Sequence, residues 1–181
     1  MKRICVFCGA KAGHDPRWRD LAQATGRALA RRGLGLVYGG GGIGLMGELA
    51  QSAMAAGGEV MGIIPRSLIR QEVGAFAITH LDVVDTMAER KMLMLARADG
   101  FLVLPGGLGT LDELFEVLTL HQIGLHDKPI AIVDADGYYA PLRAMLDRFV
   151  EAGFVLDAHV AHVGWHADPE AALDFLAQAG G

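Results

Sequence analysis

Two short stretches of the chain carry residue types that could bind an anion and act on what it is attached to. Residues 105–113 read PGGLGTLDE, where three glycines and a threonine precede two carboxylates. Glycine lets backbone N–H groups approach an anion closely, and a carboxylate can stabilise positive charge or orient water. Residues 86–91 read TMAERK and add two adjacent cations. Together the two stretches favour a phosphorylated ligand.

The cations Arg90 and Lys91 are expected near the start of a helix. Thr86 and Glu89 have the spacing of a capping box, which places both cations at the end of the first helical turn. Cations there oppose the helix dipole, so they either face water or meet an anion. We expect an anion. Arg90, which shares a helical stripe with Met87, would suit bidentate contact with phosphate or carboxylate, and Lys91 would add a point charge.

Glu113 has two possible explanations at this level. Thr110 could cap a helix with Glu113 at its third position, which would make a second capping box. The same carboxylate could instead act on a bound substrate. The spacing by itself supports both explanations equally.

Three glycine-rich turns follow apolar runs and lead into helical patterns. They are VFCGAKAG (6–13), VYGGGGIGLMG (37–47) and VLPGGLG (103–109). At one edge of a parallel sheet, such turns would gather backbone N–H groups and helix N-termini, which suits an anion. Gly42, Gly44 and Gly47 also spell GxGxxG. A dinucleotide is disfavoured, because this motif follows the second strand and Glu59 precedes the next strand instead of ending it.

Short apolar runs alternate with amphipathic stretches along the whole chain. The runs are ICVF, GLGLVY, EVMGIIP, DVV, GFLVLP, PIAIV and AHV, and the expected helices are roughly 16–32, 44–56, 86–98, 109–123, 138–151 and 168–179. This alternation predicts a three-layer, Rossmann-like α/β fold with a central parallel sheet. We expect one domain over residues 1–181, because no linker or repeat interrupts the pattern.

Composition excludes several classes of function. The formal net charge of −5 argues against binding to nucleic acid or to an anionic membrane. No apolar run approaches the ~20 residues of a membrane span, and we expect a cytoplasmic protein. Cys5 and Cys8 are expected on opposite faces of a strand, so their CxxC spacing predicts neither a redox pair nor a metal site.

The remaining clusters of histidine and aspartate are expected to have structural roles and not to bind ligands. The histidines of HVAHVGWH (159–166) are expected at a sheet edge or on the surface, in a strand followed by a loop. His121 and His126 are expected to bracket the end of a helix, and Asp134 and Asp136 to form a turn. We expect no metal and no organic cofactor.

The motifs resemble those of one known family. PGGLGTLDE matches the PGGxGTxxE signature of the LONELY GUY (LOG) family, the cytokinin riboside 5′-monophosphate phosphoribohydrolases. VVDTMAERK resembles the MxxRK segment of that family, and VFCGAKAG, YGGGGIGLMG and LHQIGLHDKPIAIVDADGYYAPL are similar to its other conserved stretches. The resemblance covers nearly the whole chain.

The resemblance implies hydrolysis of the N-glycosidic bond of AMP or an N6-modified AMP, which yields free base and ribose 5-phosphate. By analogy, Arg90 and Glu113 form the catalytic pair. The residues expected to contact the nucleotide are Glu72, Met87, Arg90, Lys91, Gly106, Gly107, Leu108, Gly109, Thr110, Leu111, Asp112, Glu113 and Thr119, with Gly9 and Gly42 from the other two glycine-rich turns. The family also suggests a homodimer.

The chain departs from the family at two positions, and other functions stay open. Ala88 and Leu120 stand where the family often has His and Trp, which leaves the choice between plain and N6-modified AMP open. A nucleotide-binding or carrier module without turnover is the alternative. Lysine decarboxylase is disfavoured, because that chemistry needs a Schiff-base lysine with pyridoxal phosphate, and Lys91 lies in an expected anion site.

Overall fold

A parallel sheet of seven strands runs through the part of the chain that the computed structural model describes, residues 1–69 and 77–180. Its spatial order is β4-β3-β2-β1-β5-β6-β7, and every neighbouring pair is parallel. The strands are Arg3–Phe7 (β1), Gly35–Tyr38 (β2), Val60–Pro65 (β3), His80–Val84 (β4), Gly100–Val103 (β5), Ile130–Val133 (β6) and Val163–His166 (β7).

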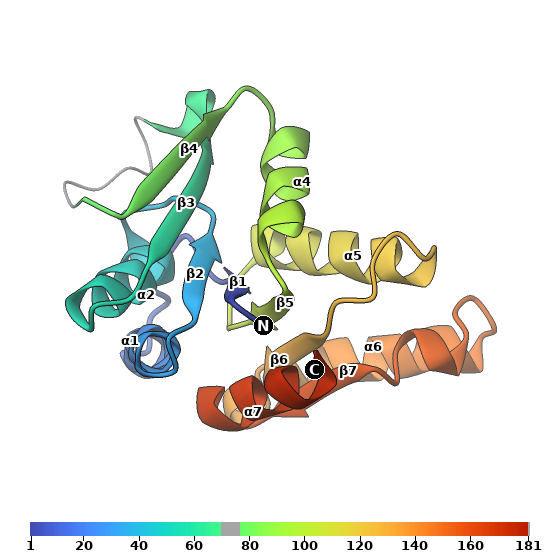
Figure 1. The fold of residues 1–181 in the computed structure, drawn as a ribbon. Coiled ribbons are helices and arrows are strands. Elements are labelled where there is room, and N and C mark those ends of the chain that lie inside the picture. Colours follow the sequence, from blue (N-terminus) through green and yellow to red (C-terminus); the bar gives the residue numbers. More distant parts are fainter. Residues whose placement is uncertain (70–76, 181) are drawn as a thin grey trace.

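Helices cover both faces of this sheet (Figure 1). They are Arg17–Arg31 (α1), Gly44–Ala55 (α2), Met87–Arg97 (α4), Leu108–Gln122 (α5), Ala140–Glu151 (α6) and Pro169–Ala179 (α7), with short 3-10 turns at Arg66–Leu68, Ala135–Gly137 and Asp157–His159. Successive strand residues point to opposite faces. Ile4 and Val6 therefore pack under α1, α2 and α7, while Cys5 and Phe7 pack under α4, α5 and α6. The three-layer prediction is confirmed.

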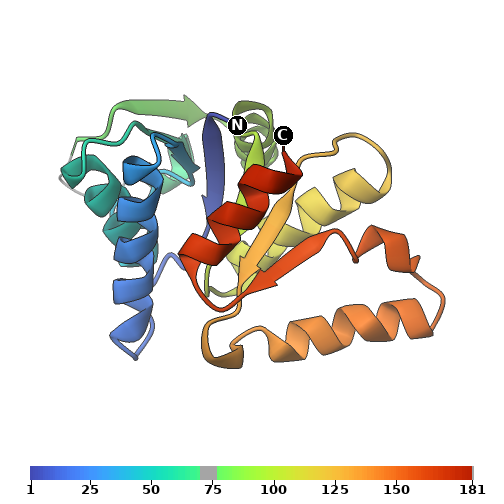
Figure 2. The same cartoon turned by 60° about the horizontal axis from the view of Figure 1, so that its bottom comes forward.

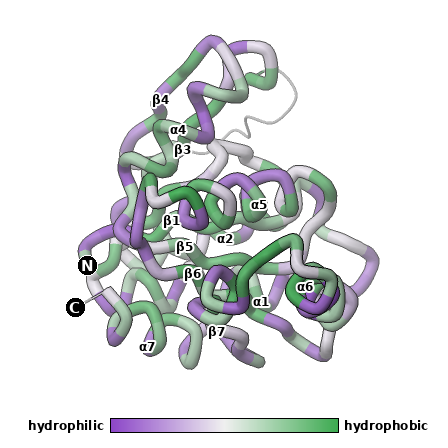
Figure 3. Tube along the Cα trace, turned by 90° about the vertical axis from the view of Figure 1, so that its right-hand side faces the viewer, coloured by the Kyte–Doolittle hydropathy of each residue, from purple (hydrophilic) through white to green (hydrophobic). Residues whose placement is uncertain are grey.

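The hydropathy of the chain follows these layers. In Figure 3 the central strands β1, β5 and β6 are largely hydrophobic, whereas hydrophilic residues recur along the outer turns of the helices. Cys5 and Cys8 are both buried free thiols, and they belong to the two different cores. Their predicted placement on opposite faces is confirmed. None of the helices in the described part of the chain has the length and apolar character that a membrane crossing needs.

One local prediction was wrong. Residues 159–166 were expected to form a strand and then a loop, but the 3-10 turn Asp157–His159 comes first and the strand β7, Val163–His166, ends the segment. The reason is register: Val163 pairs with Ile130, and Val163 and Gly164 are the residues buried against β6. The first AHV repeat, residues 158–160, has no such partner strand among the described elements.

The order in which successive strands are added to the sheet reverses between β1 and β5. The chain leaves β1 toward β2 on one side and leaves β5 toward β6 on the other, although β1 and β5 are neighbours. Two backbone hydrogen bonds hold the ends of these strands together: Leu104 N–H donates to the Phe7 carbonyl at 2.9 Å, and Gly9 N–H to the Pro105 carbonyl at 3.2 Å. In parallel α/β folds such a switch point opens a space for ligands beyond the carboxyl ends of the strands. Figure 2 shows both chain termini at the opposite end of β1.

Candidate functional site

A cavity of about 400 Å³ lies at this switch point. The turn after β1 supplies one wall, from Gly9 to Gly13, and the start of α5 supplies the other, from Gly106 to Thr110, with Tyr138 closing the side. The first N–H groups of a helix have no partner within the helix, and the dipole there carries partial positive charge. An anion in this cavity would therefore meet the positively charged amino end of α5.

The start of α5 lies within one residue of the predicted start, but the possible capping box is not formed there. The helix begins at Leu108 with Gly107 as its N-cap and no side-chain cap, and Leu111 N–H donates to the Gly107 carbonyl at 3.1 Å. A capping box was one of two explanations for Thr110 and Glu113, but both residues lie inside the helix, 3% and 8% exposed. The early start of the helix turns them toward the sheet. Capping therefore does not explain the carboxylate of Glu113.

Glu113 faces Arg90, which is 6% exposed, across the gap between α4 and α5. Arg90 Nη1 lies 3.6 Å from Glu113 Oε1. Burying two charges is costly unless they are paired, and removing one partner of such a pair is strongly unfavourable. The sequence thus places one ion pair inside the fold one helical turn from the glycine-rich wall of the cavity.

Backbone carbonyls from the turn after β2 and from β3 hold the guanidinium of Arg90. Its Nη2 donates to the Gly39 carbonyl at 2.9 Å, and its Nε donates to the Ile63 carbonyl at 3.1 Å. A Cβ atom at Gly39 would lie 1.8 Å from Nη2, so no side chain fits there while Arg90 keeps its position. Part of the glycine-rich turn after β2 therefore serves to admit Arg90, and not to present N–H groups to a ligand.

Lys91 pairs with two carboxylates of α5. Its Nζ lies 2.7 Å from Glu116 Oε2 and 3.2 Å from Asp112 Oδ2. The hydrogen bond to Glu116 is the main reason why the pKa of Lys91 is raised, so the ammonium stays charged. The two cations expected to oppose the α4 dipole thus meet carbonyls and carboxylates of the protein itself. The predicted capping box of Thr86 and Glu89 is confirmed at the start of this helix.

The two thiols near the pair are not nucleophiles. Burial, followed by the negative charge of Glu113, raises the pKa of both Cys5 and Cys8. A thiol with a raised pKa stays protonated and unreactive. Within the described residues, no group of three His, Cys, Asp or Glu side chains is placed to hold a metal ion.

The structure brings most of the predicted site residues together. Gly9 and residues 106–110 line the cavity, although the Gly9 N–H is already bonded to Pro105. Met87 Sδ lies 3.9 Å from Arg90 Nη1, and Asp112 binds Lys91. Leu111 packs against the core under α4 and α5.

Two further predicted residues lie apart from the cavity, and its lining also leaves out Arg90, Lys91 and Glu113. Gly42 belongs to the β2–α2 turn and is absent from the cavity lining. Thr119 is exposed on α5, six residues beyond Glu113, which corresponds to roughly 9 Å along the helix. Glu72 lies outside the described residues.

Two residues at the site were not predicted from the sequence. Gly39 is one glycine in a run of four, and no pattern marks which of them contacts Arg90. Tyr138, in the DADGYY turn, donates a hydrogen bond from its hydroxyl to the Gly106 carbonyl at 2.6 Å. The turn was recognised, but its contact with residues 32 positions earlier has no local signal.

Comparisons with known proteins show the family of the chain. A family model described as possible lysine decarboxylase matches residues 46–176. A cytokinin riboside 5′-monophosphate phosphoribohydrolase of Arabidopsis thaliana is 44% identical over 154 residues, which cover 85% of this chain and 72% of that protein. A probable enzyme of the same name from Oryza sativa subsp. japonica is 44% identical over 153 residues, covering 84% of this chain and 69% of the relative.

Solved structures share the fold at lower identity. The molybdenum cofactor binding protein of Rippkaea orientalis superposes with a TM-score of 0.75 at 23% identity, covering 98% of this chain and 97% of that one. The molybdenum cofactor carrier protein of Chlamydomonas reinhardtii superposes with a TM-score of 0.74 at 22% identity, with the same coverage. These likenesses establish the fold, and the sequence relatives establish the family.

Proposed function

The chain belongs to the LONELY GUY family of cytokinin riboside 5′-monophosphate phosphoribohydrolases, and we propose that it hydrolyses the N-glycosidic bond of AMP or N6-substituted AMP. The products are the free base and ribose 5-phosphate. The observation that carries the proposal is the buried Glu113 carboxylate, 3.6 Å from Arg90, one helical turn from a glycine-lined cavity at the amino end of α5.

We place the 5′-phosphate on the backbone of residues 106–110. These residues line the cavity, and the first N–H groups of α5 lack partners within the helix. A phosphate against the Glu113 carboxylate would be repelled. The ribose then lies between the phosphate and Glu113, which puts the glycosidic carbon near the carboxylate.

Glu113 is proposed to stabilise the positive charge that develops on the ribose. The bond from C1′ to the base nitrogen breaks with its electron pair leaving on the base, while water adds to C1′. Water loses one proton and the base gains one, so the reaction balances without a cofactor. Transition states of this kind resemble an oxocarbenium ion, which a nearby carboxylate stabilises. Glu113 is also placed to orient the attacking water or a ribose hydroxyl.

Arg90 is proposed to hold Glu113 in place and to face the substrate with its remaining N–H groups. Two of its N–H groups are committed to the carbonyls of Gly39 and Ile63. Nη1, which faces Glu113 and Met87, donates to neither of these carbonyls and is proposed to face the nucleotide. This arrangement favours contact near the ribose or the base over a bidentate grip on the phosphate.

The decarboxylase description of the family model finds no support in the lysines. A Schiff base forms from a neutral amine, which requires a lowered lysine pKa. The pKa of Lys91 is raised instead, first by its hydrogen bond to Glu116, and Lys128 donates from Nζ to the Leu95 carbonyl at 2.7 Å. Lys2 and Lys11 complete the set of lysines in the chain, and both are exposed.

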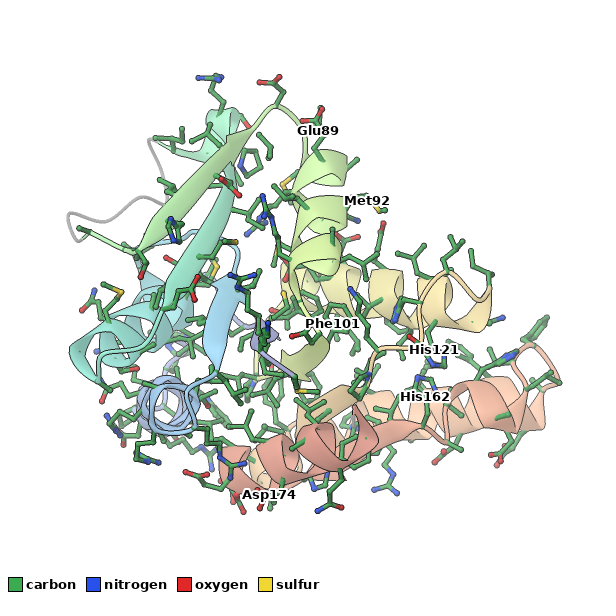
Figure 4. The ribbon with its side chains drawn as sticks, viewed as in Figure 1. Glu89, Met92, Phe101, His121, His162 and Asp174 are labelled. Carbon is green, nitrogen blue, oxygen red and sulfur yellow. The ribbon has the colours of Figure 1, made fainter. Side chains whose placement is uncertain are left out.

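A homodimer is part of the proposal. Met92 on α4 and Phe115 on α5 are exposed apolar side chains, and Met92 points away from the sheet in Figure 4. Thr119 lies on an exposed part of α5, where it would reach a nucleotide bound to a second copy. Light scattering coupled to gel filtration would measure the assembly, and a monomer under assay conditions would refute this part.

Product analysis tests the activity. The pure protein would be incubated with AMP and, separately, with N6-isopentenyladenosine 5′-monophosphate, and the products separated by chromatography. We expect free base and ribose 5-phosphate in equal amounts from one or both nucleotides. The ratio of the two rates reports what the base pocket prefers with Leu120 in place of Trp. Tight AMP binding without release of base would refute hydrolysis and leave the carrier module.

A further inference from the structure

The DADGYY turn, residues 134–139, sends two consecutive tyrosines to the loop that precedes α5. Tyr139 is buried, and its hydroxyl donates to the Leu104 carbonyl at 2.8 Å. Tyr138 is 42% exposed, and its hydroxyl donates to the Gly106 carbonyl at 2.6 Å. Tyr138 also belongs to the lining of the cavity. It is therefore the member of the pair that touches both the loop and the space for the ligand.

All three carbonyls of residues 104–106 have donors from outside the loop. Tyr139 binds the carbonyl of Leu104, the Gly9 N–H binds that of Pro105, and Tyr138 binds that of Gly106. In a trans peptide, the carbonyl of one residue and the N–H of the next lie in one plane and point in opposite directions. Fixing the Gly106 carbonyl therefore fixes the direction of the Gly107 N–H, at the N-cap of α5.

The ring of Tyr138 is itself held in place. Its edge meets Trp18 with ring centroids 5.3 Å apart, and it packs at 84° against Tyr139. The guanidinium of Arg17 lies 4.4 Å from the centre of the Trp18 ring and reaches Asp136 at 2.7 Å. These contacts join the start of α1 to the 134–139 turn. They restrict the ring, so its hydroxyl stays aimed at the glycine loop.

We infer that Tyr138 is a positioning residue for the phosphate end of the substrate. By holding the Gly106 carbonyl, Tyr138 aims the N–H of Gly107 at the 5′-phosphate, so the affinity for phosphate depends on this hydroxyl and the affinity for the base does not. The inference rests on the proposed function for the location of the phosphate. Tyr138 would thus give the 134–139 turn a role in binding the phosphate, although no residue of this turn takes part in the proposed hydrolysis.

The test compares Tyr138→Phe with wild type in the binding of the two products. Ribose 5-phosphate and adenine would each be titrated by calorimetry, because neither undergoes turnover. Loss of one hydrogen bond to a partly exposed carbonyl predicts about five- to tenfold weaker binding of ribose 5-phosphate. The dissociation constant of adenine is expected to stay within about twofold of the wild-type value. The substitution removes only an interaction that supports binding of the phosphate end, and adenine has no phosphate.

Tyr38→Phe is the matched control. It also removes one tyrosine hydroxyl, but that hydroxyl is buried and has no hydrogen-bond partner within the described residues. Neither affinity should change in this variant. Equal weakening of both products by Tyr138→Phe would mean a general structural defect and would overturn the inference. Unchanged binding of ribose 5-phosphate, or its failure to bind wild type, would overturn it too.

These outcomes are separate from those of the activity assay. A protein that binds ribose 5-phosphate but releases no base from AMP would refute the hydrolase, while the role of Tyr138 in phosphate affinity would still be supported. A hydrolase whose Tyr138→Phe variant binds ribose 5-phosphate as wild type does would keep its function and lose the positioning residue.

Discussion

Glu113 and Arg90 are the two charged side chains that the described part of the fold buries. A buried ion pair is weak evidence for stability, because desolvation of the charges offsets their attraction. In the proposed function the pair acts on the substrate, and this role would account for its burial one turn from the cavity. Gly39 belongs to the same unit, because its missing side chain is the space that the guanidinium fills.

Gly39→Ala is therefore expected to reduce activity by displacing Arg90. The backbone of Gly39 has no positive φ that alanine would avoid, so the collision at 1.8 Å with Nη2 is the physical cause. We expect base release from AMP to fall at least about tenfold in kcat/KM.

A double-mutant cycle with Arg90→Ala isolates this cause. If Gly39→Ala acts through Arg90, it should have little further effect once Arg90 is gone. Additive losses in the double variant would show that Gly39 acts by another route.

At the scale of the helices, periodicity predicted most limits within two residues, because an amphipathic stripe and its caps are local signals. The start of α4 at Met87 after Thr86 is the clearest case. The start of α5 at Leu108 was also predicted to within one residue, but its cap was not, since Gly107 is the N-cap and no side chain caps the helix there.

The candidate site likewise has a part that the sequence predicted and a part that it did not. The types and spacing of Arg90 and Glu113 could be read along the chain, and the resemblance to a known family assigned their roles. Their partners could not be predicted, because the carbonyls of Gly39 and Ile63 come from the turn after β2 and from β3, which the sheet order brings beside α4.

Lys91 joins two of these helices, and its replacement tests what it does. Lys91→Met keeps the aliphatic stem and removes the charge that Asp112 and Glu116 share. Because those carboxylates are partly exposed, we expect a loss of about 1 kcal/mol in the free energy of unfolding, smaller at high salt. Affinity for ribose 5-phosphate should change less than about threefold. A selective loss of that affinity would show instead that Lys91 contacts the phosphate.

At the scale of the whole molecule, three histidines join segments distant in sequence. The rings of His121 and His162 stack with centroids 3.7 Å apart, and Figure 4 shows them between the end of α5 and the segment before β7. His126 Nε2 lies 2.8 Å from the Val117 carbonyl, while its Nδ1 accepts from the Lys128 N–H. The neutral ring satisfies both contacts with its proton on Nε2. Sequence reasoning placed these rings separately, at a helix end and at a sheet edge.

This cluster predicts a loss of stability in mild acid. Burial is the first cause that lowers the pKa of both His126 and His162, and His121 adds repulsion. A histidine with a lowered folded-state pKa binds fewer protons than the unfolded chain, so stability is present above the ordinary value of ~6.5 and is lost as pH falls below it. Both rings are only partly buried, so we expect a few tenths of a kcal/mol per pH unit from each, between about pH 7 and pH 5.

Urea unfolding at several pH values checks this slope. His162→Phe keeps a flat ring against His121 without a titrating group, and it should flatten the decline toward pH 5. His14→Phe, at an exposed position outside the cluster, should keep the wild-type slope. Identical slopes for all three proteins would contradict a role for the cluster.

The most direct test of the central claim is the rate of base release by Glu113→Gln at saturating AMP, with AMP affinity measured alongside. Glutamine fills the same space without the charge that the oxocarbenium-like transition state requires. We predict that kcat falls by about 10³-fold or more while the dissociation constant for AMP stays within about threefold. A variant that releases base at the wild-type rate would contradict the assignment of Glu113 as the catalytic carboxylate.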